Sequence, residues 1–116
     1  LLAGVQPTIN GDGMQTRDYV YVGDVVRANL AVLGLPGFRT YNVGTAVETN
    51  VNELFDRLRA AIGTGPPADH GPAKAGEQMR SCITSALLEQ ELGLRIGTPF
   101  DQGIQMTADW FRAQAG

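Results

Sequence analysis

Apolar side chains recur at helical intervals after Asp24 and again after Thr49. Asp24 is expected to cap the first helix, which ends before Gly34. The second helix is expected to open at Thr49 or Asn50, with Glu53 in the capping-box position. Its apolar face comprises Val51, Leu54, Phe55, Leu58 and Ile62. The pattern therefore predicts two amphipathic helices between residues 24 and 62.

Two further helical patterns occupy the last third of the chain. Ser85 is expected to cap a short helix over residues 86–92, which Gly93 ends. A longer helix follows over about residues 100–114. The large apolar residues expected to face inward from it are Phe100, Ile104, Met106, Trp110 and Phe111.

Shorter apolar runs between the helical patterns predict strands. Residues 7–10 and 17–22 are expected to form two strands, the second rich in β-branched and aromatic side chains. A tight turn at 11–13, in which glycines adopt positive φ, is expected to join them. Residues 41–44 and 79–83 are expected to add brief strands.

The segment 63–73 interrupts this order, because glycines and prolines stand there among small and polar residues, which is typical of a loop. Strands and helices alternate along the chain, yet the strands are few, short and separated. A full doubly wound sheet cannot be built from them. The predicted fold is therefore a small mixed α/β domain, mostly helical, with short strands.

Composition narrows the range of partners. The chain has 116 residues, 43% of them apolar, which suits one domain. A net charge of −3 argues against nucleic acid as a partner. No apolar stretch reaches the roughly 20 residues that cross a bilayer, so we expect no membrane association. One cysteine, Cys82, indicates a reducing, cytoplasmic setting, and the single histidine, His70, has no evident catalytic partner in sequence.

The most informative residue is Arg17, which stands at the mouth of the apolar run 19–22. A guanidinium in that position is expected to be partly buried and to need an anionic partner. A diphosphate would suit its two-pronged geometry. The alternative is an internal ion pair with Asp12, Asp18 or Asp24.

Two other positions carry candidate chemistry. Lys74 and Glu77 flank a glycine turn that would place a cation for phosphate and a carboxylate for ribose hydroxyls together. The same spacing also occurs where both side chains are simply solvated. Tyr19 lies two residues beyond Arg17, hence on the same face of the expected strand, although a core tyrosine would fit the pattern equally well. Arg80 is a further cation that reads most simply as a surface arginine.

Three motifs carry a resemblance to a known family: GDGMQTRDYVYVGDVV at residues 11–26, YNVG at 41–44 and PAKAGE at 72–77. In this order and spacing they resemble the C-terminal third of extended short-chain dehydrogenases/reductases, above all bacterial UDP-glucose 4-epimerases. The resemblance runs from about the first residue to the last.

The resemblance implies roles for particular residues. Arg17 would bind the diphosphate of a nucleotide sugar, with Lys74 assisting and Glu77 holding the ribose. Tyr19 would lie near the nucleotide, as would Asn42, by similarity to related sugar-nucleotide dehydratases. NAD would be bound by an N-terminal Rossmann domain that these residues do not include, and the full-length protein would be a homodimer.

The sequence departs from the family at defined points. Lys74 stands where an arginine is usual, which weakens the case for bidentate phosphate binding there. The chain contains no Tyr-x-x-x-Lys pair, and the glycine string at 11–16 is not followed by a helical pattern as a dinucleotide fingerprint would be. We therefore expect residues 1–116 to form a C-terminal sugar-nucleotide-binding domain, without catalytic or metal-binding residues, that exposes apolar surface where the Rossmann domain would pack.

Two other functions stay open. The dTDP-glucose 4,6-dehydratases share the Arg-Asp and Tyr-Asn-x-Gly elements, but they tend to have histidine where this chain has Glu77, which favours the epimerase. A noncatalytic binding or scaffolding domain is an alternative from a different class. Only sequence upstream of this chain would separate the scaffold from an enzyme.

Overall fold

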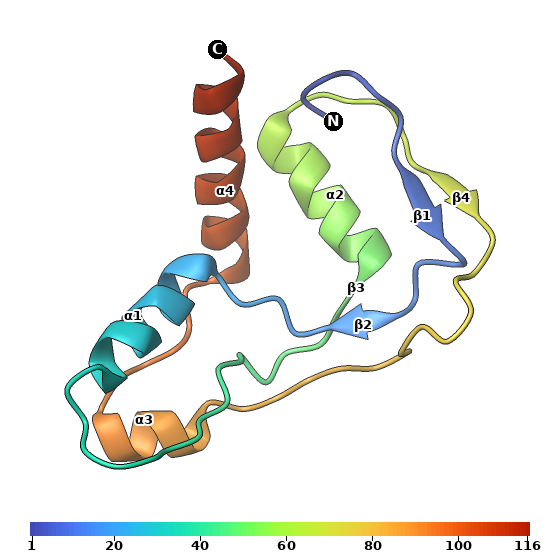
Figure 1. Cartoon of the computed structure of the whole chain (residues 1–116). Coiled ribbons are helices and arrows are strands. Elements are labelled where there is room, and N and C mark those ends of the chain that lie inside the picture. Colours follow the sequence, from blue (N-terminus) through green and yellow to red (C-terminus); the bar gives the residue numbers. More distant parts are fainter.

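The computed structural model describes all residues from 1 to 116 and confirms a small mixed α/β fold (Figure 1). Its helices are α1 Val22–Val32, α2 Val51–Ile62, α3 Ala86–Leu92 and α4 Phe100–Ala115. Its strands are short: β1 Thr8–Asn10, β2 Thr16–Arg17, β3 Thr49–Asn50 and β4 Asp69–Gly71. Helices therefore account for most of the regular structure.

The strands pair across long stretches of sequence. β1 runs parallel to β4, with Ile9 opposite His70, and β2 runs antiparallel to β3, with Thr16 opposite Asn50. The hairpin expected between residues 7–10 and 17–22 is therefore wrong, because β1 and β2 each pair with a later segment. β4 occupies part of the segment expected to be a loop.

The glycine turn between β1 and β2 is confirmed. Gly11 and Gly13 adopt φ values of 67° and 74°, a region that glycine enters without steric cost. The backbone carbonyl of Gly13 accepts hydrogen bonds from the amides of Val51 and Asn52. The turn thus supplies acceptors for the free amides at the start of α2.

Two expected strands are absent. Neither residues 41–44 nor residues 79–83 form a strand. The nearest pairing is an isolated bridge between Thr45 and Thr84. The apolar run after Arg17 is not a strand either. β2 ends at Arg17, and α1 begins at Val22. Side-chain hydrogen bonds, described below, hold these segments in place of a sheet.

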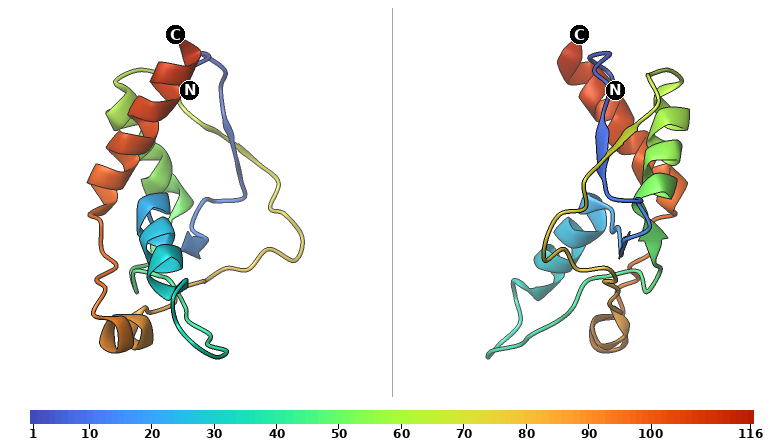
Figure 2. Two further views of the ribbon diagram at one scale, coloured as in Figure 1. Left: turned by 60° about the vertical axis from the view of Figure 1, so that its left-hand side comes forward. Right: turned by 90° about the vertical axis from the view of Figure 1, so that its right-hand side faces the viewer.

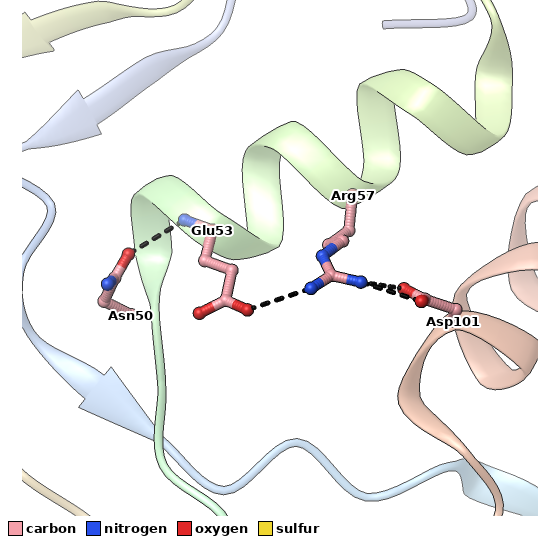
Figure 3. Close-up of polar contacts among 4 residues, drawn as sticks. All are labelled: Asn50, Glu53, Arg57 and Asp101. Carbon is pink, nitrogen blue, oxygen red and sulfur yellow. Dashed lines mark hydrogen bonds and ion pairs between the residues drawn. The ribbon is translucent and has the colours of Figure 1, made fainter.

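Helices α2 and α4 lie side by side (Figure 1). The expected start of α2 is confirmed, because the Asn50 side chain accepts a hydrogen bond of 2.8 Å from the Glu53 amide (Figure 3). The Arg57 guanidinium then reaches both carboxylate oxygens of Asp101 on α4 at 2.7 Å. The Arg112 guanidinium of α4 also donates a 2.6 Å hydrogen bond to the Ala61 carbonyl of α2, so several separate polar contacts join the helix pair.

Helix α4 matches its predicted range but not its predicted face. Trp110 and Phe111 are more than half exposed, with their rings in edge-to-face contact 4.9 Å apart. They are therefore not core residues of this chain, and only the earlier part of the stripe, with Phe100 and Ile104, is partly buried.

Helices α1 and α3 differ from expectation at their caps. Tyr21, not Asp24, occupies the N-cap position of α1, and the Asp24 side chain is buried against Thr98. Ser85 precedes α3 as predicted, but its hydroxyl bonds the backbone of Gly44 and caps nothing. The left-handed C-cap at Gly93 is confirmed.

The molecule is flat, with principal-axis extents of 49, 37 and 19 Å, and its core is small. Figure 2 gives two further views of the chain. Its Cα radius of gyration is 16.6 Å, against about 13 Å for a compact domain of this length. Only 12 of 116 residues are buried, and three of them, Ala28, Leu88 and Ile96, form the hydrophobic core cluster. The expected exposure of apolar surface is confirmed, most clearly along α1, where one helical stripe is open: Val22, Val26, Leu30 and Leu33.

Candidate functional site

Arg17 ends β2 and is one-third exposed. Its Nη1 donates hydrogen bonds to the backbone carbonyls of Thr16 at 2.7 Å and Gln78 at 2.6 Å. Its Nη2 lies 3.6 Å from Glu77 Oε1. One edge of the guanidinium is thus fixed by the backbone, while the other edge holds a carboxylate at long range.

The internal partner of Arg17 is therefore Glu77, and the predicted alternatives are wrong. Asp12 accepts a hydrogen bond from the amide of Met14, and Asp18 and Asp24 bind other segments. A separation of 3.6 Å is too long for a charge-assisted hydrogen bond. The Nη2 edge of Arg17 consequently retains donor capacity for an anion.

Glu77 lies where the sequence predicts, at the end of a glycine turn. Gly76 adopts a φ of 75°, and the Glu77 amide donates a 3.2 Å hydrogen bond to the Lys74 carbonyl. The Glu77 side chain is one-quarter exposed, whereas Lys74 is exposed and forms no ion pair. The turn therefore directs the carboxylate toward Arg17 and leaves the ammonium in solvent.

Tyr19 shares the neighbourhood of this pair. Burial is the main cause that raises the pKa of its hydroxyl; the charge of Arg17 opposes the rise and that of Glu77 adds to it. Its ring lies 6.1 Å from that of Phe100, centroid to centroid. Tyr19 also lines two adjoining cavities of about 280 and 220 Å³. The structure thus brings Tyr19, Arg17 and Glu77 together.

Asn42 stands apart from this group. It is exposed and takes part in no side-chain hydrogen bond, and the strand expected around it is absent. Arg80 does not extend the group either, because its guanidinium grips both oxygens of Glu48, at 2.9 and 2.6 Å. The reading of Arg80 as a surface arginine is confirmed by its 79% exposure.

Three carboxylates that the sequence does not single out as site residues hold the surrounding segments. Asp18 accepts hydrogen bonds from the amides of Thr45 and Ala46 at 3.0 Å, and from the Ile83 amide at 3.3 Å. Burial raises the pKa of Asp18, but the hydrogen bonds from Thr45, Ile83 and Ala46 together bring it below its ordinary value. The carboxylate is therefore ionised in this setting.

Glu48 and Asp24 act in the same way. The Arg80 fork, with a further hydrogen bond from the Thr16 hydroxyl, lowers the pKa of Glu48 to about 2. Asp24 is 1% exposed and accepts hydrogen bonds of 2.9 Å from both the amide and the hydroxyl of Thr98. No local pattern predicts these partners, because they lie 32 and 74 positions away.

The glycine turn does not fit a dinucleotide. β2 follows it in place of a helix, and the Gly13 carbonyl already binds the start of α2. A Cβ atom on Gly13 would lie 2.1 Å from Asn52 Oδ1, so this glycine makes room for a neighbouring side chain. The residues of this chain therefore form no NAD-binding fingerprint.

Other candidate chemistry has no support in the geometry. Nδ1 of His70 lies 2.7 Å from the Gly11 carbonyl, with no nucleophile beside it. Burial and the charge of Asp18 raise the pKa of Cys82, which makes its thiol less ready to act as a thiolate. No cluster of three or more acidic, histidine or cysteine side chains is placed to bind a metal ion. None of the helices has the length and apolar character that a bilayer crossing requires.

Sequence comparison identifies relatives. A sequence model described as the NAD dependent epimerase/dehydratase family matches residues 1–44. The chain is 38% identical to a putative UDP-glucose 4-epimerase of Methanocaldococcus jannaschii and 37% identical to a UDP-glucose 4-epimerase of Mycolicibacterium smegmatis, over 97% of this chain and 36% of each relative. A dTDP-glucose 4,6-dehydratase of Xanthomonas campestris is 33% identical over 95% of this chain and 34% of its own length.

Solved structures agree with these relatives. The UDP-glucose 4-epimerase of Thermotoga maritima, determined with UDP-glucose, superposes with a TM-score of 0.92 at 33% identity, over 99% of this chain and 37% of that one. The Thermus thermophilus UDP-glucose 4-epimerase, determined with NAD, gives a TM-score of 0.83 at 36% identity, over 96% and 37%. This chain thus spans little more than one-third of the length of its relatives. Over nearly all of its length it is similar to members of the NAD dependent epimerase/dehydratase family, and it corresponds to their C-terminal part.

Proposed function

We propose that these 116 residues are the substrate-binding part of an NAD-dependent nucleotide-sugar epimerase that interconverts UDP-glucose and UDP-galactose. The observation that carries the proposal is the meeting of Arg17 with Glu77, two residues from distant segments, beside the half-buried ring of Tyr19. The high similarity to UDP-glucose 4-epimerases supports the choice of substrate.

Each of the three residues has a definite task in this proposal. The free Nη2 edge of Arg17 binds the diphosphate, since a short charge-assisted bond to phosphate is stronger than the 3.6 Å contact with Glu77. Glu77 accepts hydrogen bonds from the ribose hydroxyls. Tyr19, at the rim of two cavities, packs against the nucleotide.

Lys74 and Asn42 complete the proposed set with less structural support. Lys74 is exposed and unpaired, so its flexible side chain is available to a phosphate as a point charge. Asn42 is exposed, and its proposed place near the nucleotide rests on resemblance to dehydratases. We expect these two positions to contribute less than Arg17 and Glu77.

The contribution of this chain is binding and orientation. Its residues form no NAD-binding fingerprint, so NAD would be held by a Rossmann domain outside these residues, and the hydride chemistry at C4 of the hexose belongs to that cofactor. Arg17 and Glu77 would fix the nucleotide so that the sugar is presented to the reacting groups. The chain alone would be inactive, and the full-length protein would be a cytoplasmic homodimer.

A second candidate function follows from the comparisons. The relatives include dTDP-glucose 4,6-dehydratases at 33% identity, so a thymidine-linked sugar is the competing substrate. A noncatalytic nucleotide-sugar-binding or scaffolding domain is the alternative outside enzymology. Affinity separates the first two, and turnover by the full-length protein excludes the third.

The test is calorimetric titration of the full-length protein with UDP-glucose, dTDP-glucose and glucose. We expect UDP-glucose to bind most tightly and glucose not to bind. Arg17→Ala should weaken UDP-glucose binding by roughly 1.5 to 3 kcal/mol, the size of a lost hydrogen bond to a charged group. Arg59→Ala is the matched control, because that guanidinium bonds only the Gly65 carbonyl. Unchanged affinity of a folded Arg17→Ala protein would refute the proposal.

A further inference from the structure

Asp18 lies between Arg17 and Tyr19 in sequence, yet its side chain belongs to another part of the molecule. Both carboxylate oxygens accept from the Thr45 amide at 3.0 Å, and Oδ1 also accepts from the Thr45 hydroxyl at 2.5 Å. Oδ2 accepts from the amides of Ala46 and Ile83. One carboxylate thus joins three segments of the chain.

The backbone at Thr45 and Ala46 is shaped around this carboxylate. Ala46 has a φ of 60° and is the only residue other than glycine with a positive φ. An L-alanine rarely adopts this conformation because its Cβ approaches the backbone. Consecutive amides in such a turn converge on one point and form a site for an anion. Asp18 fills that site from within the chain.

The strand that carries Arg17 is fastened to the segment that carries Glu77 by a 2.8 Å backbone hydrogen bond from the Thr16 amide to the Met79 carbonyl, and contacts of Asp18 and Glu48 add to this bond. The Ile83 amide binds Asp18 on one side of Arg17, and Arg80 reaches the strand through Glu48, which accepts from the Thr16 hydroxyl on the other side. The segment from Glu77 to Ile83 is therefore tied to the residues before and after Arg17, although no ladder of strand hydrogen bonds holds it.

We propose that Asp18 is a positioning residue for nucleotide-sugar binding. By filling the Thr45–Ala46 turn and holding the Ile83 amide, it sets the separation between the Arg17 guanidinium and the Glu77 carboxylate. This inference rests on the proposed function of that pair. Asp18 does not touch the ligand, because its two oxygens are already occupied by four donors from Thr45, Ala46 and Ile83.

Asp18→Asn is the informative substitution because it keeps the size of the side chain. It removes the charge and replaces one acceptor oxygen with an amide nitrogen, which faces N–H donors it cannot bind. In the full-length protein we expect the Kd for UDP and the KM for UDP-glucose to rise about tenfold, as a 1.4 kcal/mol loss would give. The kcat should change little, because the reacting groups lie elsewhere.

A control variant, a milder variant and a double mutant show whether the effect of Asp18→Asn is specific to ligand binding. Asp109→Asn, at an exposed carboxylate of α4 that pairs with Arg112, should leave binding of UDP unchanged. Thr45→Val removes the hydroxyl, which donates to Asp18 and accepts from the Val47 amide, and keeps the backbone contacts with Asp18, so it should raise the Kd a few-fold even where Asp18→Asn fails to fold. In an Arg17→Ala background, Asp18→Asn should add little, because its effect on the ligand passes through Arg17.

The outcomes distinguish the positioning role of Asp18 from the proposed function of Arg17 and Glu77 in nucleotide-sugar binding. If Arg17→Ala leaves UDP binding intact, the proposed function fails. If Arg17→Ala weakens binding but Asp18→Asn and Thr45→Val do not, only the positioning role is overturned. A loss of kcat without loss of affinity, or full additivity with Arg17→Ala, would likewise show that Asp18 does not act through the Arg17–Glu77 pair.

Discussion

The α2–α4 helix pair and the segments around Arg17 are held together in different ways. Within the helix pair, α2 has local caps at Asn50 and Gly63, and an exposed contact of Arg57 with Asp101 and a part-buried contact of Arg112 with the Ala61 carbonyl join the two helices. The segments around Arg17 have almost no regular structure, and long-range contacts of three carboxylates hold them: Asp18, Asp24 and Glu48.

The difference has an energetic basis. An exposed helix loses stability in small steps, because each cap or ion pair can be replaced by water. The carboxylate of Asp24, which is 1% exposed, cannot be replaced so easily, since its removal leaves the Thr98 donors without partners; Asp18 and Glu48 are partly buried and hold several donors each. The candidate site therefore depends on a few residues, whereas the helix pair spreads its stability over many.

We expect Asp24→Ala to lower the free energy of unfolding more than any variant of the α2–α4 helix pair. The substitution leaves the Thr98 amide and hydroxyl without their buried acceptor. We expect a loss of about 3 kcal/mol in the free energy of unfolding, the usual scale for such a deletion. Urea unfolding of the chain measures it. Asp24→Asn, which keeps one acceptor oxygen, should cost less; a loss below that of any helix-pair variant would contradict the prediction.

Asn50→Ala tests how much the N-cap of α2 contributes to stability. The Glu53 amide loses its acceptor but becomes solvated at the start of α2. A loss of about 1 kcal/mol is expected for removal of such a cap. Asn50→Asp, which preserves the acceptor, is the control and should unfold at nearly the wild-type urea concentration. Equal losses in the two variants would show that the cap hydrogen bond is not the cause.

These two regions also explain which parts of the fold could be predicted from sequence. The start of α2 at Asn50 and the end of α3 at Gly93 were predicted correctly, because a cap depends on residues within one turn of the chain. The strand expected at residues 17–22 was wrong, because β-propensity depends on a pairing partner and β3 reaches only as far as Arg17.

In the candidate site too, features set by local sequence could be predicted and features set by distant partners could not. The glycine turn that presents Glu77 could be predicted from its spacing. The pairing of Glu77 with Arg17 and the partners of Asp18 could not, because each joins segments far apart in sequence with no periodic pattern between them. Trp110 and Phe111 were misplaced for a related reason: helical spacing identifies an apolar stripe but not what covers it.

Falling pH should weaken the contacts that Glu48 makes with Arg80 and Thr16. The pKa of Glu48 is lowered from 4.5 to about 2, so its contribution to stability is complete above 4.5 and is lost as the pH falls toward 2. NMR titration of the Glu48 carboxyl should show this low value. Arg80→Ala should return the pKa part of the way to 4.5, with the Thr16 hydroxyl still lowering it. A wild-type titration near 4.5 would contradict the assigned contact.

Arg57→Ala should produce the smallest effect, although its guanidinium lies only 2.7 Å from both carboxylate oxygens of Asp101. Arg57 reaches Asp101 at 2.7 Å and Glu53 at 3.3 Å, but all three side chains are well exposed (Figure 3). Water and counterions screen such pairs. The change in urea midpoint should therefore be smaller than for Asn50→Ala and should vanish in 1 M salt, where the Debye length is about 3 Å. A large, salt-independent loss would mean that the packing of α2 against α4 depends on this one contact.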